Sequence, residues 1–152
     1  MIFTPIIGGN KLIEKFKGIF PAFYACYDDE GEVSEERTKV LCNHLYQKGV
    51  KGLYVGGSSG ECIYQNLAER KATLKYVADN LKGKLTLIAH VGAPSTRESV
   101  ILAKYAEDLG YDALSAIPPI YFQLPESSIY KYWSEIIDAT ELPFIIDRKS
   151  VV

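Results

Sequence analysis

The chain has 152 residues, of which 47% are hydrophobic and 24% are charged, and its formal net charge at pH 7 is -2. This size and composition are typical of one globular domain with a hydrophobic core. The charge offers no electrostatic basis for binding nucleic acid or an anionic membrane, and no apolar run approaches the ~20 residues of a membrane helix. The three cysteines lack C-x-x-C spacing, which predicts free thiols in a reducing cytoplasm.

Strands and helices are predicted to alternate along the chain. Each predicted strand is a short run of continuous apolar residues, which is typical of strands buried on both faces of a parallel sheet. Turn glycines recur about every 30 residues, the size of a βαβ unit. The predicted strands are Gly18–Tyr24, Gly52–Gly57, Leu85–Gly92, Ala113–Pro119 and Pro143–Ile146.

Four helices are predicted between these strands. Asn66 and Glu69 have the spacing of a capping box at a helix start, and so do Ser95 and Glu98. The apolar residues that follow Asn66 recur at helical spacing and predict the buried stripe of that helix: Leu74, Val77, Ala78 and Leu81. The predicted helices begin at about Ser34, Asn66, Ser95 and Glu126.

Two architectures fit this alternation: a doubly wound open sheet and part of a (β/α)₈ barrel. No G-x-G-x-x-G follows the first predicted strand, which disfavours a dinucleotide-binding sheet. A whole barrel needs ~250 residues. The predicted fold class is therefore α/β, a partial (β/α)₈ TIM barrel of about four and a half βα units.

Glycines and hydroxyls follow the second predicted strand directly, in the sequence Gly-Leu-Tyr-Val-Gly-Gly-Ser-Ser-Gly-Glu at residues 52–61. A turn of this kind leaves backbone N–H groups uncovered, and Ser58 and Ser59 add hydroxyl donors. These groups suit a small carboxylate or phosphate at the carboxyl end of a strand. His90 lies inside an apolar strand and is predicted to be a core or barrel-lining residue. No metal-ligand spacing is present.

Five segments of the chain match a known family: residues 52–61, Glu69-Arg70, Ile-Ala-His-Val-Gly at 88–92, Gly-Tyr-Asp-Ala at 110–113 and Pro-Pro-Ile-Tyr at 118–121. On these segments rests a resemblance to the N-acetylneuraminate lyase and dihydrodipicolinate synthase superfamily. It runs from about residue 16 to residue 146. The double glycine and the Ile-Ala-His-Val-Gly segment are more similar to the neuraminate lyase branch.

The resemblance implies a class I aldolase barrel in which a lysine on the sixth strand forms a Schiff base with a 2-oxo acid. It implies that Gly57, Ser58 and Ser59 bind the substrate carboxylate, and that Tyr121 is a catalytic-site residue, which in the synthases reaches across a subunit interface. It also implies a homotetrameric parent enzyme that acts on a small 2-oxo acid or sialic acid, with neither a metal nor an organic cofactor.

The resemblance stops at Ile146, where the family continues with Tyr-Asn-Ile-Pro and its catalytic tyrosine. Here Asp147 occupies the tyrosine position, and no sixth strand with a lysine follows. We expect residues 1–15 to be an N-terminal extension, 16–146 to be the N-terminal half of the barrel, and 147–152 to be a non-native tail. A sequencing artefact, a frameshift and a natural truncation are the alternatives for that tail.

Three functions remain open at this point. The first is a truncated N-acetylneuraminate lyase, whose parent cleaves N-acetylneuraminate to N-acetylmannosamine and pyruvate. The second is a dihydrodipicolinate synthase or another 2-oxo-acid aldolase. The third is a non-catalytic fragment that keeps only an anion-binding loop. In each case the 152-residue chain itself is predicted to be inactive.

Overall fold

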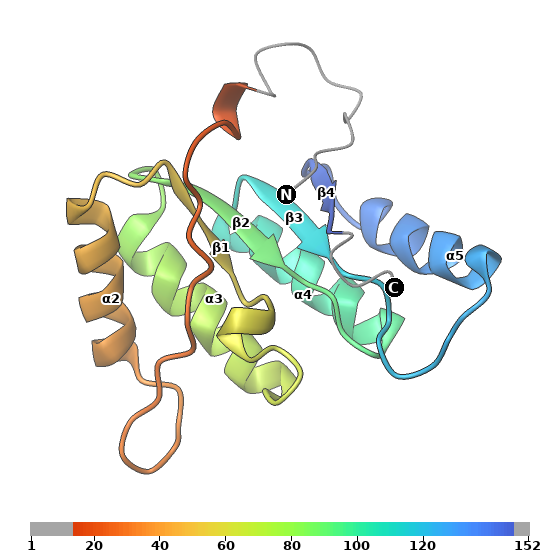
Figure 1. The fold of residues 1–152 in the computed structure, drawn as a ribbon, viewed down its shortest axis with the longest axis horizontal. Helices are drawn as coiled ribbons and strands as arrows, with labels where there is room; N and C mark the ends of the chain where they lie inside the picture. The colour runs from red at the N-terminus through yellow and green to blue at the C-terminus, as the bar shows by residue number, and fades with distance from the viewer. Residues whose placement is uncertain (1–13, 148–152) are drawn as a thin grey trace.

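In a computed structural model of the chain, which describes residues 14–147, four parallel strands form one sheet (Figure 1). Their order in the sheet is their order in the sequence, β1-β2-β3-β4. The strands are β1 (Gly52–Val55), β2 (Thr86–His90), β3 (Ala113–Ala116) and β4 (Phe144–Ile146). Each begins within a residue of the predicted position, but β1, β2 and β3 end two or three residues earlier than predicted.

The helices are α2 (Glu35–Gln47), α3 (Leu67–Leu81), α4 (Thr96–Leu109) and α5 (Glu126–Ile137), and a 3₁₀ turn, η1 (Ser58–Gly60), follows β1. The expected capping box forms at α3, where the Asn66 side chain accepts from the Glu69 N–H and the Glu69 carboxylate accepts from the Asn66 N–H. At α4 the Ser95 side chain accepts from the Glu98 N–H. These caps explain why both helices begin where the sequence predicts.

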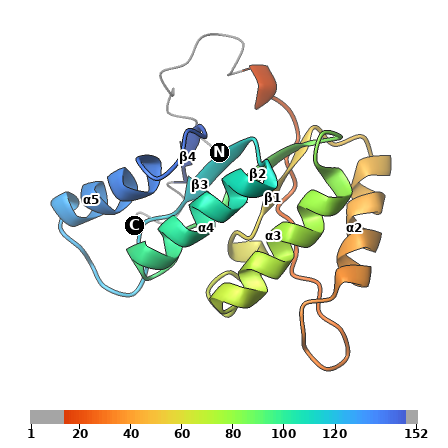
Figure 2. The same cartoon turned by 180° about the vertical axis from the view of Figure 1, so that it is seen from behind.

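All four helices lie on one side of the sheet, as Figures 1 and 2 show from opposite directions. Neighbouring helices in the sequence pack against each other, α2 on α3, α3 on α4 and α4 on α5. Sequential strand order with helices on one side is the arrangement of a barrel wall. A doubly wound sheet would have helices on both sides and a reversal in strand order. The partial-barrel prediction is confirmed.

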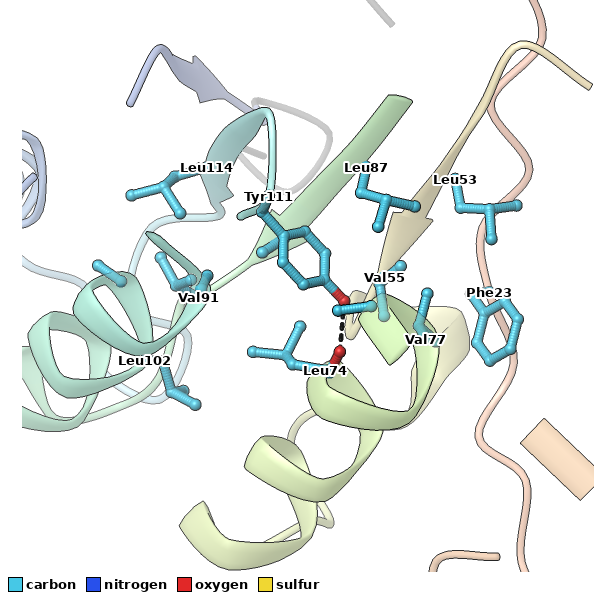
Figure 3. Packing of buried hydrophobic residues seen from close by; sticks show 14 of the residues in the cluster. Phe23, Leu53, Val55, Leu74, Val77, Leu87, Val91, Leu102, Tyr111 and Leu114 are labelled. Atoms are coloured by element: carbon cyan, nitrogen blue, oxygen red, sulfur yellow. Dashed lines mark hydrogen bonds between the residues drawn. The ribbon is translucent and has the colours of Figure 1, made fainter. Parts of the chain in front are cut away.

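The main core fills the space between the sheet and the helices (Figure 3). Leu53, Leu87 and Leu114 point from three successive strands toward Leu74 of α3 and Leu102 of α4. The Tyr111 hydroxyl crosses this layer and donates to the Leu74 carbonyl at 3.0 Å. The four predicted stripe residues of α3 are all buried here.

The opposite face of the sheet carries a smaller apolar cluster. Tyr54 pairs in register with Ile88, and Ile88 with Ala113. These residues pack with Ile145 and with Phe16, which precedes the sheet. In a closed barrel this is the inner face, and along each strand it alternates with the helix-facing side.

The predicted first strand, Gly18–Tyr24, is wrong as a regular strand. The segment runs beside β1, but a single bridge joins Ala22 to Tyr54. The Phe23 N–H donates to the Tyr54 carbonyl at 2.8 Å, and the Tyr54 N–H donates to the Pro21 carbonyl at 3.0 Å. A regular parallel ladder would next need an N–H at residue 21, which Pro21 lacks.

Most of the expected N-terminal extension, residues 1–13, and of the expected tail, residues 148–152, lies outside the described residues. Asp147 is described. Its N–H donates to the Ala116 carbonyl at 3.3 Å, which extends the pairing of β4 with β3 by one hydrogen bond.

Candidate functional site

The loop after β1 carries the predicted substrate-binding residues. Gly56 has a φ of +73°, which turns the chain sharply at the strand end. The Gly57 carbonyl then accepts from the Gly60 N–H at 2.9 Å, which closes the η1 turn. Ser58 and Ser59 are both exposed on this turn. The loop therefore presents two adjacent hydroxyls at the carboxyl edge of the sheet.

Gly57 lies directly over the ring of Tyr54. A Cβ atom on Gly57 would come within 2.5 Å of the Tyr54 Cε1 atom, closer than real Cβ contacts allow. The φ of Gly57 is -81°, a value open to any residue. Glycine is therefore required at this position by the close approach of the Tyr54 ring. The backbone conformation of Gly57 does not require it.

Tyr121 follows β3 and lies at the same edge of the sheet as Ser58 and Ser59, because the strands are parallel. Its side chain is 84% exposed and packs edge-on against Phe122, with ring centroids 4.7 Å apart. No contact recorded among residues 14–147 joins Tyr121 to either serine. The structure brings these residues to one edge but leaves the tyrosine apart from the hydroxyl pair.

A small apolar hollow lies among the loops after β1, β2 and β3. Its volume is about 20 Å³, close to that of one water molecule, and its lining includes Cys62, Gly92 and Ile117. Within the described residues no three His, Cys, Asp or Glu side chains gather in a metal-binding group. No helix in residues 14–147 has the length and apolarity needed to cross a membrane.

On the inner face a chain of hydroxyls links three strands. The Tyr54 hydroxyl donates to the Ser115 Oγ at 3.1 Å, and the Ser115 hydroxyl donates to the Ile145 carbonyl at 2.7 Å. The Tyr54 hydroxyl also lies 3.4 Å from an Asp147 carboxylate oxygen. Burial, more than the nearby Asp147 charge, raises the pKa of Tyr54 well above its ordinary value. Tyr54 is therefore a neutral hydrogen-bond donor at neutral pH.

His90 ends β2 and is only 1% exposed, in agreement with the prediction of a core or barrel-lining histidine. Its Nδ1 lies 2.9 Å from the Gly56 carbonyl, and the Ile117 N–H donates to its Nε2 at 3.3 Å. Burial, assisted by the positive charge of Arg70, lowers its pKa to about 4, although the bond to Gly56 opposes the shift. The imidazole is neutral at neutral pH.

Arg70 extends from α3 under the same strand end, and it is 5% exposed. Its Nη1 donates to the Gly92 carbonyl and its Nη2 to the His90 carbonyl, both at 2.8 Å. In the sequence, Arg70 stands out only as part of the Glu69-Arg70 motif, and no pattern assigns Tyr54 a role. A signal for Arg70 was present, since it falls four residues before Leu74 on the apolar stripe of α3.

Comparison with known proteins supplies the family. The sequence profile of the Dihydrodipicolinate synthetase family matches residues 15–148. The chain belongs to this family. An N-acetylneuraminate lyase of Mediterraneibacter gnavus is 56% identical over 124 residues, which are 82% of this chain and 39% of that protein. N-acetylneuraminate lyase 2 of Escherichia coli O6:H1 is 42% identical over 133 residues, which are 87% of this chain and 44% of that protein.

Among solved structures, a catalytic lysine mutant of the Ruminococcus gnavus sialic acid aldolase is similar to this member of the dihydrodipicolinate synthetase family, with a TM-score of 0.86 and 53% identity. The match covers 88% of this chain and 44% of that one. The chain thus spans about two fifths of the length of these relatives. The similarity agrees with the observed sheet, and the fold is part of a TIM barrel.

The described loops that follow β1, β2 and β3, residues 56–66, 91–95 and 117–125, contain no lysine. Lys149 follows β4 in the sequence and lies outside the described residues. At the opposite edge, by contrast, a hollow of about 700 Å³ has Lys15, Lys17, Lys51 and Lys84 in its lining. Barrel enzymes carry out their chemistry at the carboxyl edge, so these four lysines are at the wrong end for an imine with a substrate held by Ser58 and Ser59.

Proposed function

We propose that the chain is the carboxylate-binding part of an N-acetylneuraminate lyase, an enzyme that cleaves N-acetylneuraminate to N-acetylmannosamine and pyruvate. The observation that carries this proposal is the 56% identity, over 82% of the chain, with a relative named for that activity. The activity of the whole enzyme is part of the proposal, because the chain spans only part of its relatives.

In this proposal Ser58 and Ser59 hold the substrate carboxylate with their hydroxyls, and the Gly57 turn lets the carboxylate approach the backbone N–H groups. Support comes from the exposure of both serines and from the turn that η1 makes at the strand end. Hydrogen bonds from neutral donors to a carboxylate are shorter and about twice as strong as those between neutral groups. Tyr121 is proposed to act near the reacting oxygen, from the loop after β3.

The lyase chemistry itself requires a lysine that forms a Schiff base with the oxo acid. The described loops 56–66, 91–95 and 117–125 contain no lysine, and Lys149 belongs to the segment expected to be a non-native tail. We therefore expect the 152-residue chain to bind the oxo acid without forming an imine. Borohydride treatment with pyruvate, followed by intact mass spectrometry, tests this expectation. Stoichiometric trapping on one lysine would contradict it.

A second candidate is a dihydrodipicolinate synthase or another 2-oxo-acid aldolase, since the family whose profile matches the chain is named for the synthetase. Both candidates bind a 2-oxo acid carboxylate at the same loop, so the loop cannot separate them. Sugar binding can: titration with N-acetylmannosamine, with pyruvate present, should shift amide signals near Tyr121 if the lyase assignment is right. The third alternative, a non-catalytic fragment, binds anions at Ser58 and Ser59 without preference for oxo acids.

We also propose a cytoplasmic location and a homotetrameric parent enzyme. The free thiols of Cys26, Cys42 and Cys62 support a reducing compartment. The exposed Tyr121 and Phe122 rings support a subunit contact at the loop after β3. Sedimentation of the parent enzyme with Phe122→Ser would test that contact, since loss of the tetramer is expected.

The central experiment is a titration of the ¹⁵N-labelled chain with pyruvate, followed through backbone amide shifts. Signals of Ser58 and Ser59 should move first. The Ser58→Ala/Ser59→Ala variant should bind roughly 30- to 1000-fold more weakly, since two charge-assisted donors together contribute about 2–4 kcal/mol. The matched control is Ser127→Ala/Ser128→Ala, an adjacent pair of exposed serines on α5. Equal affinity of the loop variant and its parent would refute the carboxylate site.

A further inference from the structure

His90 contacts the carboxyl ends of two neighbouring strands from its place at the end of β2. Its ring reaches the carbonyl of Gly56, which directly precedes Gly57 and the two serines, and the N–H of Ile117, which begins the loop leading to Tyr121. The side chain is buried, and the contact with Gly56 is shielded from water, whereas the contact with Ile117 is partly buried. One imidazole therefore joins the two loops that carry every residue of the proposed site.

Only one form of the ring satisfies both contacts. A carbonyl oxygen can only accept, so Nδ1 must carry the proton that faces Gly56. A backbone N–H can only donate, so Nε2 must be unprotonated where it faces Ile117. The opposite tautomer would place donor against donor at Ile117 and acceptor against acceptor at Gly56. The imidazolium would lose the acceptor for Ile117.

Arg70 holds this arrangement in place from α3. Its guanidinium donates to the carbonyls of His90 and Gly92, on either side of the strand end, and its Nη2 lies 3.5 Å from the His90 Nδ1. A positive charge so close disfavours a second proton on the ring. Among residues 14–147 no ion pair with a carboxylate is recorded for Arg70. Burying a charge is costly, and here the guanidinium is satisfied by two backbone carbonyls.

We infer that His90, held in its Nδ1–H form by the Gly56 carbonyl and the Ile117 N–H, is a positioning residue that sets the serine loop and the Tyr121 loop at one mutual geometry for oxo-acid binding. This inference rests on the proposed function. It assigns His90 no contact with substrate. Its action passes through the backbone of Gly56, two residues before Ser58, and of Ile117, four residues before Tyr121.

The tautomer can be measured in the unaltered chain. Ring ¹⁵N signals of His90 at pH 7 should show one protonated nitrogen, assigned to Nδ1, and one unprotonated nitrogen, assigned to Nε2. The Ile117 amide should exchange slowly with solvent. A protonated Nε2, or a rapidly exchanging Ile117 amide, would overturn the inference without any variant.

Three substitutions of His90 test its two hydrogen bonds separately. His90→Asn places a donor where Nδ1 was and can keep the bond to Gly56, whereas His90→Gln places an acceptor where Nε2 was and can keep the bond to Ile117. His90→Phe keeps neither bond. We expect His90→Phe to weaken pyruvate binding about tenfold to a hundredfold, because two buried backbone groups lose their partners. Partial recovery in His90→Asn and His90→Gln would separate positioning from simple packing.

The matched control is Leu87→Ala, which lies on the same strand but faces the helices. It should lower stability while leaving pyruvate affinity within about twofold of the parent. A folded His90→Phe variant with parental affinity would refute the inference. If the parent itself shows no pyruvate shifts at Ser58 and Ser59, the proposed function fails. The positioning claim is then decided by the ligand-free Ser58 and Ser59 amide shifts, which must move in His90→Phe and stay in place in Leu87→Ala.

Discussion

Replacing Gly57 with alanine should destabilise the chain through one defined clash. The new Cβ would lie 2.5 Å from the Tyr54 Cε1 atom and 3.0 Å from its Cδ1 atom. The Tyr54 ring cannot easily move aside, because it is 6% exposed and its hydroxyl is bonded to Ser115. The ring or the loop must therefore shift.

The magnitude follows from two opposing contributions. Overpacking of a well-filled site costs about 1–3 kcal/mol. Alanine restricts the unfolded chain more than glycine does, which returns about 0.4–1 kcal/mol at a φ that alanine adopts without strain, and Gly57 has such a φ. The net expectation for Gly57→Ala is a loss of about 1–2 kcal/mol in the free energy of unfolding.

Urea denaturation of four proteins tests the cause: the parent, Gly57→Ala, Tyr54→Ala and the double variant. If the ring is the obstacle, Gly57→Ala should be neutral or slightly stabilising once Tyr54 is already alanine, and the coupling energy should be about 1–3 kcal/mol. Additive effects would refute the steric argument. So would a Gly57→Ala chain that is more stable than its parent, because the entropic contribution would then be acting alone.

Three further predictions concern stability. Tyr111→Phe should lower the free energy of unfolding by about 1–2 kcal/mol, because the buried Leu74 carbonyl loses its donor, and an unchanged urea midpoint would contradict this. Asn66→Ala should cost about 1 kcal/mol through loss of the α3 cap, and hydrogen exchange should increase in the first turn of that helix. His90 should make stability fall as the pH is lowered from about 6.5 to 4, because its folded pKa of about 4 lies below the unfolded value and only the unfolded chain takes up the proton. The contribution of His90 to the free energy of unfolding is about 3 kcal/mol and is fully present above pH 6.5. The stability of His90→Phe should therefore fall less than that of the parent between pH 6.5 and 4. An identical pH profile for the two proteins would argue against a neutral buried ring.

The helices and the strand order could be predicted because local signals and the global fold agree. The Asn66 and Ser95 caps mark real helix starts, and the stripe from Leu74 to Leu81 is buried as its spacing predicts. The predicted strands are longer than the observed ones, because the apolar runs in the sequence continue past the last paired residue. Val91 and Ile117, for example, directly follow the ends of β2 and β3. Gly18–Tyr24 looked like a strand for the same reason, although Pro21 removes a donor that the ladder needs.

The candidate site, too, could be predicted from the sequence only in part. Ser58 and Ser59 could be placed at the carboxyl edge, because the residues that follow a parallel strand lie at that edge. The roles of Tyr54 and Arg70 could not be derived, since they depend on which face of β1 is inward and on where α3 crosses β2. An arginine in line with Leu74 was a usable signal, because a charge on an apolar stripe must find buried acceptors.

The polar groups beneath the loop find their hydrogen-bond partners within the described residues. His90 and Arg70 bond to backbone groups at the strand ends, and Tyr54 bonds to the Ser115 hydroxyl and lies 3.4 Å from an Asp147 carboxylate oxygen. Burial strengthens each of these bonds and makes each costly to break, so the loop that carries Ser58 and Ser59 is held from below by groups that never need to touch a ligand. The proposed carboxylate recognition would therefore depend on contacts internal to residues 14–147, whereas imine formation depends on a lysine that the described loops after β1, β2 and β3 do not contain. A chain of this kind should bind before it can react, and pyruvate affinity without borohydride trapping is the combination that this division predicts.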